Sequence, residues 1–217
     1  MSLNPELIPV KKDLETIRKE VLGNVIKMLN ARGLIHDKNL KKHMDDIKKI
    51  SEDDTYIFKL DEPFKVEQKD KKNPSKVDNL QVAVKIIHQK IQGSKIPIIK
   101  DFVTQYSTSH KIFIFSGMSE KARSSLIEQP NTEVFVESFL MVNILEHIDS
   151  PKYELLSEEE KEEVVHTYIV KKKELKKILT SDPIVSYFNV KRGDIIRIIR
   201  SSEQSGNSVD YRIVANG

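Results

Sequence analysis

The chain has 217 residues, which suits one large domain or two small ones, and its lack of cysteine excludes a disulfide scaffold, a cysteine nucleophile and a thiolate zinc site. Its formal net charge is only +3, from 36 basic and 33 acidic residues, so a polybasic protein that coats DNA is not expected. No apolar run approaches the ~20 residues that span a bilayer, and the first residues carry no secretory pattern, so we expect an intracellular protein.

Hydrophobic spacing predicts a mixture of helices and strands in the first two thirds of the chain. Apolar residues three and four positions apart predict helices at 13–32, 39–50, 96–106 and 120–127. Short apolar or alternating runs predict strands at 55–60, 64–67, 80–87, 111–115 and 132–136. Because helices separate the strands, the pattern favours an α/β or α+β layered structure.

The chain turns irregular around residues 145–153, and this predicts a domain boundary there. We expect an N-terminal domain of residues 1–145 and a C-terminal domain of residues 146–217. In the second domain, Ser157 and Glu160 have the spacing of a capping box, which predicts a helix that reaches about residue 168.

Further helices and two strands complete the predicted C-terminal domain. Residues 174–180 are predicted as a short helix, and Asp182 and Pro183 as the cap and first residue of the next one. Strands at 195–200 and 209–214 then close the domain as a hairpin, with Gly193 in the turn before them and Gly206 in the loop between them.

One set of charged residues matches a known catalytic pattern. Asp61 in a predicted turn, with Glu67 and Lys69 after the next strand, has the order of a metal-dependent nuclease, in which carboxylates hold the metal and the lysine positions water. Glu-x-Lys is nevertheless frequent in a chain with 32% charged residues, so a solvated loop is the favoured interpretation. The nuclease stays open as an alternative, and no other metal or cofactor site is expected.

Basic residues alternate with apolar ones near the end of the chain. On a strand, Arg200 shares a face with Ile196 and Ile198. Either its aliphatic stem covers the edge of the core, or its guanidinium meets a partner, and the pattern alone leaves both open.

The same C-terminal region resembles one known family. It reads Ser-Asp-Pro-Ile-Val-Ser-Tyr-Phe at 181–188, Lys-Arg-Gly-Asp-Ile-Ile-Arg-Ile-Ile-Arg at 191–200, Ser-Ser-Glu at 201–203 and Tyr-Arg-Ile-Val at 211–214. This ordered pattern is similar to the small subunit shared by the three eukaryotic nuclear RNA polymerases, which has a shorter counterpart in the archaeal RNA polymerase. A weaker resemblance extends over nearly the whole chain in the eukaryotic-type arrangement. Its divergence and its Lys- and Ile-rich composition make a large DNA virus one expected source.

The resemblance implies a non-catalytic subunit of a DNA-directed RNA polymerase. Its expected fold is α+β, with an N-terminal α/β jaw domain that resembles a nuclease-like fold without an active site, followed by a small α+β assembly domain that ends in a β-hairpin. The implied partners are the largest subunit, other polymerase subunits and downstream DNA, with no cofactor, membrane or small-molecule ligand. The implied location is the nucleus for a cellular protein, and the host cytoplasm or the virion for a viral one.

The resemblance also leads to three sets of expected functional residues. The candidates for docking on the largest subunit are Lys191, Arg192, Arg200, Tyr211 and Arg212. The candidate DNA-proximal strip is Lys69, Lys71, Lys72 and Lys76. Structural caps and turns are assigned to Asp182, Pro183, Gly193 and Gly206. A free-standing adaptor is the remaining alternative function.

Overall fold

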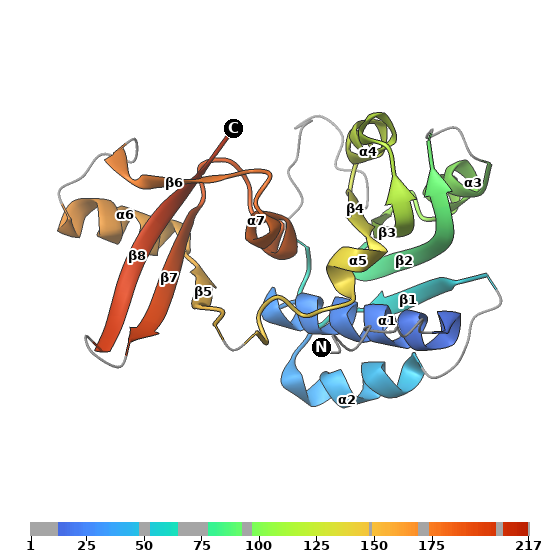
Figure 1. Ribbon diagram of the computed structural model, residues 1–217, viewed down its shortest axis with the longest axis horizontal. Coiled ribbons are helices and arrows are strands. Elements are labelled where there is room, and N and C mark those ends of the chain that lie inside the picture. Colours follow the sequence, from blue (N-terminus) through green and yellow to red (C-terminus); the bar gives the residue numbers. More distant parts are fainter. Residues whose placement is uncertain are drawn as a thin grey trace, which may run out of the picture. The chain divides into compact units, whose positions relative to one another are not determined.

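The computed structural model describes residues 13–47, 53–64, 78–92, 97–147, 149–168, 174–202 and 206–216. These residues form two compact units that divide after Val142. Each unit is built on its own four-stranded sheet of mixed strand direction, with helices packed against it (Figure 1). The fold is therefore α+β, as predicted. No helix of the described residues is long and apolar enough to cross a membrane.

The sheet of the N-terminal unit has the strand order β1-β2-β3-β4. Its strands are β1 (Thr55–Lys59), β2 (Asp78–Ile91), β3 (Ser109–Met118) and β4 (Thr132–Val136). β1 runs antiparallel to β2, whereas β2, β3 and β4 are parallel. Residues 109–115 of β3 are all buried, which agrees with a central strand covered on both faces.

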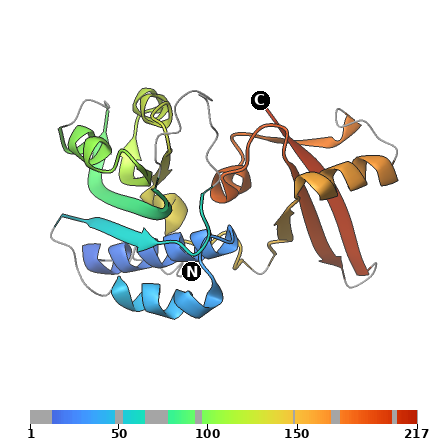
Figure 2. The same cartoon turned by 180° about the vertical axis from the view of Figure 1, so that it is seen from behind.

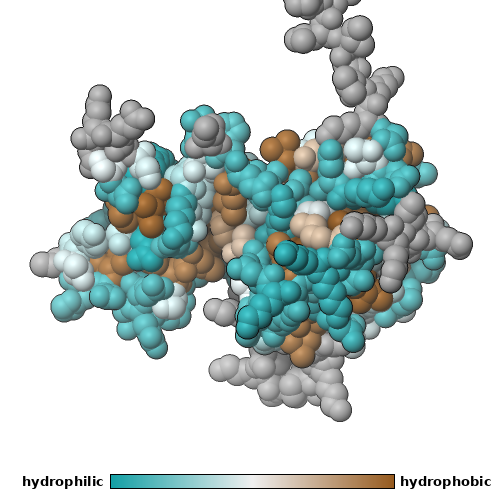
Figure 3. Space-filling model, turned by 90° about the horizontal axis from the view of Figure 1, so that it is seen from below, coloured by the Kyte–Doolittle hydropathy of each residue, from teal (hydrophilic) through white to brown (hydrophobic). Residues whose placement is uncertain are grey.

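Helices cover both faces of this sheet. They are α1 (Leu14–Ala31), α2 (Asp37–Asp46), α3 (Pro97–Gln105), α4 (Glu120–Ile127) and α5 (Glu137–Leu140). Figure 1 shows α1 on one side of the sheet with α2 outside it, and α3 and α4 on the other side. Figure 3 looks onto the α2 side, which is largely hydrophilic, so α2 is the outermost layer there.

The sheet of the C-terminal unit has the strand order β5-β7-β8-β6. Its strands are β5 (Lys152–Leu155), β6 (Lys176–Leu179), β7 (Ile195–Ser202) and β8 (Gly206–Ala215). Helices α6 (Glu158–Thr167) and α7 (Pro183–Phe188) lie on opposite faces of this sheet (Figure 2). Ile196 and Ile198 pack with α7, whereas Ile195 packs with Val164 of α6. We call these two sides the α7 face and the α6 face.

Two segments of the C-terminal unit differ from the prediction. The helix predicted at 174–180 is wrong, because residues 176–179 form strand β6 parallel to β8. This pairing buries Ile178 and leaves Lys176 and Lys177 exposed, so tertiary pairing overrides a local helical pattern. The irregular stretch predicted up to Tyr153 contains the start of β5, which pairs with β7 more than 40 residues later.

Candidate subunit-docking surface

The candidate docking residues lie on and beside the β7–β8 hairpin. Ile196 pairs with Arg212, and Arg200 pairs with Ser208. Since directly paired residues project from the same side of a sheet and side chains alternate along each strand, Arg200 and Arg212 both belong to the α7 face. Tyr211 pairs with Arg197 and therefore projects from the α6 face.

Arg200 and Arg212 differ in their surroundings on the α7 face. Arg212 donates through Nε to Oδ2 of Asp210 at 3.1 Å, and the Lys176 ammonium lies 3.0 Å from Oδ1 of the same carboxylate. Burial raises the pKa of Asp210, but the hydrogen bonds from Lys176 and Arg212 outweigh burial and lower that pKa below its usual value. Arg200 is exposed, although it follows the buried Ile198 on the same face.

Tyr153 of β5 links the two arginines electrostatically. It pairs with Ile198 and packs against the α7-face core. Burial, followed by the negative charge of Asp182, raises the pKa of the Tyr153 hydroxyl, and the positive charges of Arg200 and Arg212 oppose this rise. Tyr153, Arg200 and Arg212 thus share the α7 face, where Asp210 already pairs with Arg212.

Tyr211 belongs to a separate cluster on the α6 face. Its ring lies 5.5 Å from that of Tyr168, measured between centroids. On the same face, the Glu154 carboxylate forms two ion pairs. Its Oε2 lies 2.5 Å from Nη2 of Arg197, and its Oε1 lies 2.7 Å from Nζ of Lys152. The predicted docking set is therefore divided between the two faces of the sheet.

Lys191 and Arg192 form a third group, in the turn before β7. Both side chains are exposed, and they lie at the opposite end of β7 from Arg200. Gly193 has a φ of +93°, and its N–H donates to the carbonyl of Val214 at 3.0 Å. The left-handed conformation explains glycine at this position of the turn.

The other predicted cap and turn residues stabilise the ends of elements. Oδ1 of Asp182 accepts a hydrogen bond from the N–H of Ile184 at 2.9 Å, and Pro183 is the first residue of α7. Gly206 begins β8 with a φ of +71°, in the region that favours glycine.

The nuclease alternative finds no support at Asp61. Oδ2 of this carboxylate accepts from the backbone N–H of His36, and Oδ1 accepts from the amide of Asn39, both at 2.7 Å. The hydrogen bond from His36 is the main reason that the pKa of Asp61 is lowered. Asp61 therefore fixes the start of α2, as a structural residue would.

The remaining candidates lie outside the described residues. These are Glu67 and Lys69 of the nuclease pattern and the whole lysine strip, namely Lys69, Lys71, Lys72 and Lys76. Among the residues that the structure does describe, no group of three His, Asp or Glu side chains could hold a metal ion.

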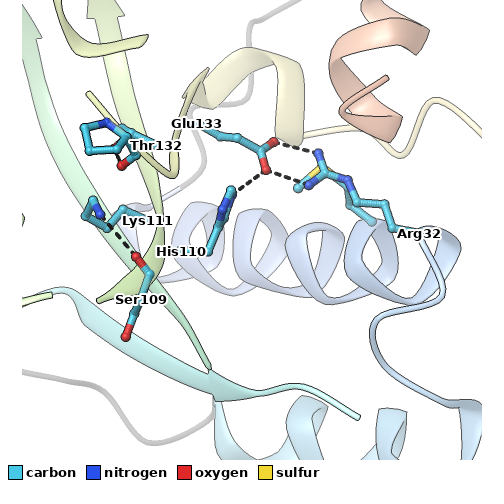
Figure 4. Close-up of polar contacts among 8 residues, drawn as sticks. Arg32, Ser109, His110, Lys111, Thr132 and Glu133 are labelled. Atoms are coloured by element: carbon cyan, nitrogen blue, oxygen red, sulfur yellow. Dashed lines mark hydrogen bonds and ion pairs between the residues drawn. The ribbon is translucent and has the colours of Figure 1, made fainter. Parts of the chain in front are cut away.

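Arg32, His110 and Glu133 form a buried ionic cluster in the N-terminal unit (Figure 4). No local sequence signal indicates this cluster. The two guanidinium nitrogens of Arg32 lie 2.8 and 2.7 Å from the two carboxylate oxygens of Glu133, and Nε2 of His110 lies 2.6 Å from Oε1. Burial alone would raise the pKa of Glu133, but Arg32 and His110 outweigh burial and lower it to about 2. The cluster joins α1 to the sheet.

Lys111, the next residue of β3, is buried on the opposite side of the strand. Its ammonium donates to the backbone carbonyl of Ser109 at 3.1 Å (Figure 4). It also donates to the backbone carbonyl of Tyr106 at 3.3 Å. Burial lowers the pKa of Lys111. These contacts place a positive charge at carbonyls just after α3, where a helix attracts cations.

Comparisons with known proteins match the region that contains the β7–β8 hairpin and the elements around it. Residues 142–214 match the family model described as RNA polymerase Rpb5, C-terminal domain. DNA-directed RNA polymerase subunit 5 of Acanthamoeba polyphaga mimivirus is 35% identical over 216 residues, which cover 99% of this chain and 100% of the relative. The chain belongs to the RNA polymerase subunit 5 (Rpb5) family.

Cellular members of the Rpb5 family are also similar to the chain. Subunit RPABC1 of DNA-directed RNA polymerases I, II and III from Caenorhabditis elegans is 28% identical over 225 residues, with 93% of this chain and 98% of the relative covered. The Caenorhabditis briggsae protein of the same name is 37% identical over 106 residues, with 48% and 50% covered. The predicted family resemblance is confirmed, and the chain is a non-catalytic polymerase subunit.

Proposed function

We propose that the C-terminal unit docks on the largest subunit of a DNA-directed RNA polymerase, and that the N-terminal unit serves as a jaw beside downstream DNA. The similarity to polymerase subunit 5 from end to end supports a role inside the polymerase. The observation that carries the docking assignment is the position of Arg200, an exposed arginine on the face whose preceding residues Ile196 and Ile198 are buried.

Arg200 and Arg212 have complementary properties for such a contact. Arginine is enriched in the energetically important centres of protein interfaces, since its planar guanidinium forms several hydrogen bonds and its stem packs on apolar surface. Asp210 already holds Arg212, so that side chain is pre-oriented, whereas Arg200 is exposed at the hairpin end. Lys191, Arg192 and Tyr211 contribute, in this proposal, from the turn and from the α6 face.

For the jaw role, the support comes from composition. Lys69, Lys71, Lys72 and Lys76 lie within eight consecutive positions, and a local strip of this kind suits contacts with DNA phosphates. The net charge of +3 fits a subunit whose neighbours in the assembly supply much of the phosphate neutralisation. The proposed location follows the polymerase: the nucleus of a cell, or the host cytoplasm or virion of a virus.

Affinity purification with mass spectrometry tests the docking assignment directly. The chain carrying Arg200→Glu and Arg212→Glu is expected to retain about tenfold less largest subunit than the unaltered chain, because two cations on the α7 face become anions. The control is Lys41→Glu with Lys42→Glu on α2, which reverses the charges of two exposed lysines outside the C-terminal unit. Unchanged retention by a folded Arg200/Arg212 variant would refute the docking surface. Complexes without polymerase would instead support a free-standing adaptor.

A further inference from the structure

The N-terminal unit has an open groove that the docking proposal does not use. It has a volume of about 550 Å³ and lies between α3 and the β1–β2 edge of the sheet. Ile98, Asp101, Phe102 and Gln105 line one wall, and their spacing of three, four and seven residues places them on one stripe of α3. Strands β1 and β2 provide the other wall and the floor.

The groove exists because the helices on this side do not reach β1. The core cluster beneath α3 and α4 contains residues of β2, β3 and β4 and none of β1 among the described residues. Ile57 of β1 pairs with Ala83 of that cluster and so belongs to the same face, yet it is 51% exposed. Ile98 on the α3 wall is 54% exposed. The α3 wall of the groove therefore carries an exposed apolar side chain, and Ile57 is exposed on the same sheet face beyond the residues that line the groove.

The charged lining consists of three carboxylates and one ammonium. Asp53, Asp54 and Asp101 line the groove together with Lys85, and His88 also lines it. The Lys85 ammonium already donates to the carbonyl of Asp53 and to the hydroxyl of Thr55, the latter at 3.0 Å.

Two of these carboxylates remain available for a ligand. The guanidinium of Arg18 lies 2.6 Å from Asp54 and neutralises it. Asp53 and Asp101 are exposed, and neither carboxylate has an ion-pair partner among the described residues. Since Arg18 neutralises Asp54 and Lys85 offsets one of the other two carboxylates, the groove keeps a net charge of −1 beside the exposed Ile98.

We infer that this groove binds a short basic and apolar segment of a partner protein. The exposed Ile98 favours burial of aliphatic side chains against it, and the carboxylates of Asp53 and Asp101 favour lysine or arginine on the same segment. The same carboxylates repel DNA phosphates, so this face of the N-terminal unit is turned toward protein rather than toward DNA. The assignment of the partner to the polymerase assembly rests on the proposed function, whereas the chemistry of the groove does not.

A peptide titration with the full chain tests the chemistry of the groove. The probe is a fluorescein-labelled 12-residue peptide with leucine at helical spacing and lysine at the other positions, and the matched control peptide has glutamate in place of lysine. Fluorescence anisotropy is expected to show saturable binding of the lysine peptide only. Equal binding of both peptides, or no saturable binding of either, would overturn the inference.

Variants of the chain identify the site. Asp53→Asn with Asp101→Asn is expected to weaken binding of the lysine peptide by about tenfold, since each exposed ion pair accounts for a factor of about two to five. Ile98→Ser is expected to weaken it as well. The control, Glu162→Gln with Glu163→Gln, removes two exposed charges from α6 and is expected to change nothing. Equal effects of the control and the Asp53/Asp101 variant would show nonspecific charge attraction and refute the groove.

A photo-crosslinking residue at position 98 of the chain in assembled polymerase tests the partner. A crosslink to a basic segment of another protein is the expected result, and a crosslink to DNA or to a second copy of this chain would overturn the inference. Failure of the chain to enter polymerase would overturn the proposed function alone, because the peptide titration needs only the isolated chain.

Discussion

The two units have sheets of equal strand number but place their charges differently. In the N-terminal unit, Arg32 and Glu133 form an ion pair whose side chains are only 4% and 10% exposed. In the C-terminal unit, Arg197 and Glu154 pair at the sheet surface, with side chains 33% and 26% exposed. Because solvent screens surface charges and desolvation penalises buried ones, loss of one partner is expected to have very different costs in the two units.

The largest expected effect is that of Glu133→Gln. The substitution leaves the buried Arg32 guanidinium without its carboxylate, so the free energy of unfolding of the N-terminal unit is expected to fall by about 3–5 kcal/mol. Hydrogen–deuterium exchange followed by mass spectrometry of β3 and β4 peptides measures this change separately from the C-terminal unit. A loss of unfolding free energy below about 1 kcal/mol would contradict the expected difference between the buried and the surface ion pair, because loss of a surface ion pair already costs up to that amount.

Acid is expected to have the next largest effect, through the same carboxylate. The pKa of Glu133 is about 2 in the folded chain and 4.5 as the ordinary value, so the unfolded chain binds the proton first as the pH falls. The resulting stabilisation, about 3 kcal/mol, is present above pH 4.5 and is lost as the pH falls toward 2. The free energies of unfolding of the unaltered chain and of Glu133→Gln, measured between pH 6 and pH 2.5, should converge as the pH falls. A difference in free energy that does not change with pH would refute the assignment.

Lys161 sharpens the comparison, since it is a buried charge in the C-terminal unit. Its side chain is 5% exposed and its ammonium lies 2.6 Å from carboxylates of both Glu158 and Asp194. Lys161→Met keeps the aliphatic stem but deprives Asp194 of its cation, so we expect a loss of about 1–3 kcal/mol. Exchange rates in α6 and the turn before β7 report it. Unchanged exchange rates in these segments would show that the free-energy loss depends on which unit holds the charge and not on how deeply the charge is buried.

The smallest expected effect is that of Glu154→Gln at the surface of the C-terminal sheet. Lys152 and Arg197 both contact this carboxylate, and their hydrogen bonds lower the pKa of Glu154. Water can solvate both cations after the substitution, so the loss is expected to stay below about 1 kcal/mol. Exchange rates in β5 and β7 measure it, and a larger loss would remove the distinction between surface and buried pairs.

Elements with complete local signals could be predicted from the sequence. Helix α4 and strand β4 have the predicted bounds, and the Ser119 side chain accepts from the N–H of Ala122 at the start of α4. The predicted capping box of Ser157 and Glu160 is present at α6. In each case the stabilising contact lies within a few residues, so local chemistry is sufficient.

Contacts between distant residues could not be predicted in the same way. Strands β5 and β6 depend on pairing with β7 and β8, and Arg32 meets Glu133 across 101 positions of the chain. For the candidate docking site, alternation along β7 predicted that Arg200 shares a face with Ile196 and Ile198. The hairpin register decides that Arg212 lies on the same face as Arg200 and that Tyr211 lies on the other face. A strand pattern alone leaves this register open.

The unequal lengths of β5 and β7 matter for the protein before it assembles. β5 pairs with β7 only as far as Ile199, so the backbone of residues 200–202 has no neighbouring strand on that side among the described residues. An open strand edge invites pairing with another chain, and a charged side chain at such an edge discourages it. Arg200 occupies this position, so the residue proposed to recognise the largest subunit also opposes self-association of the free protein.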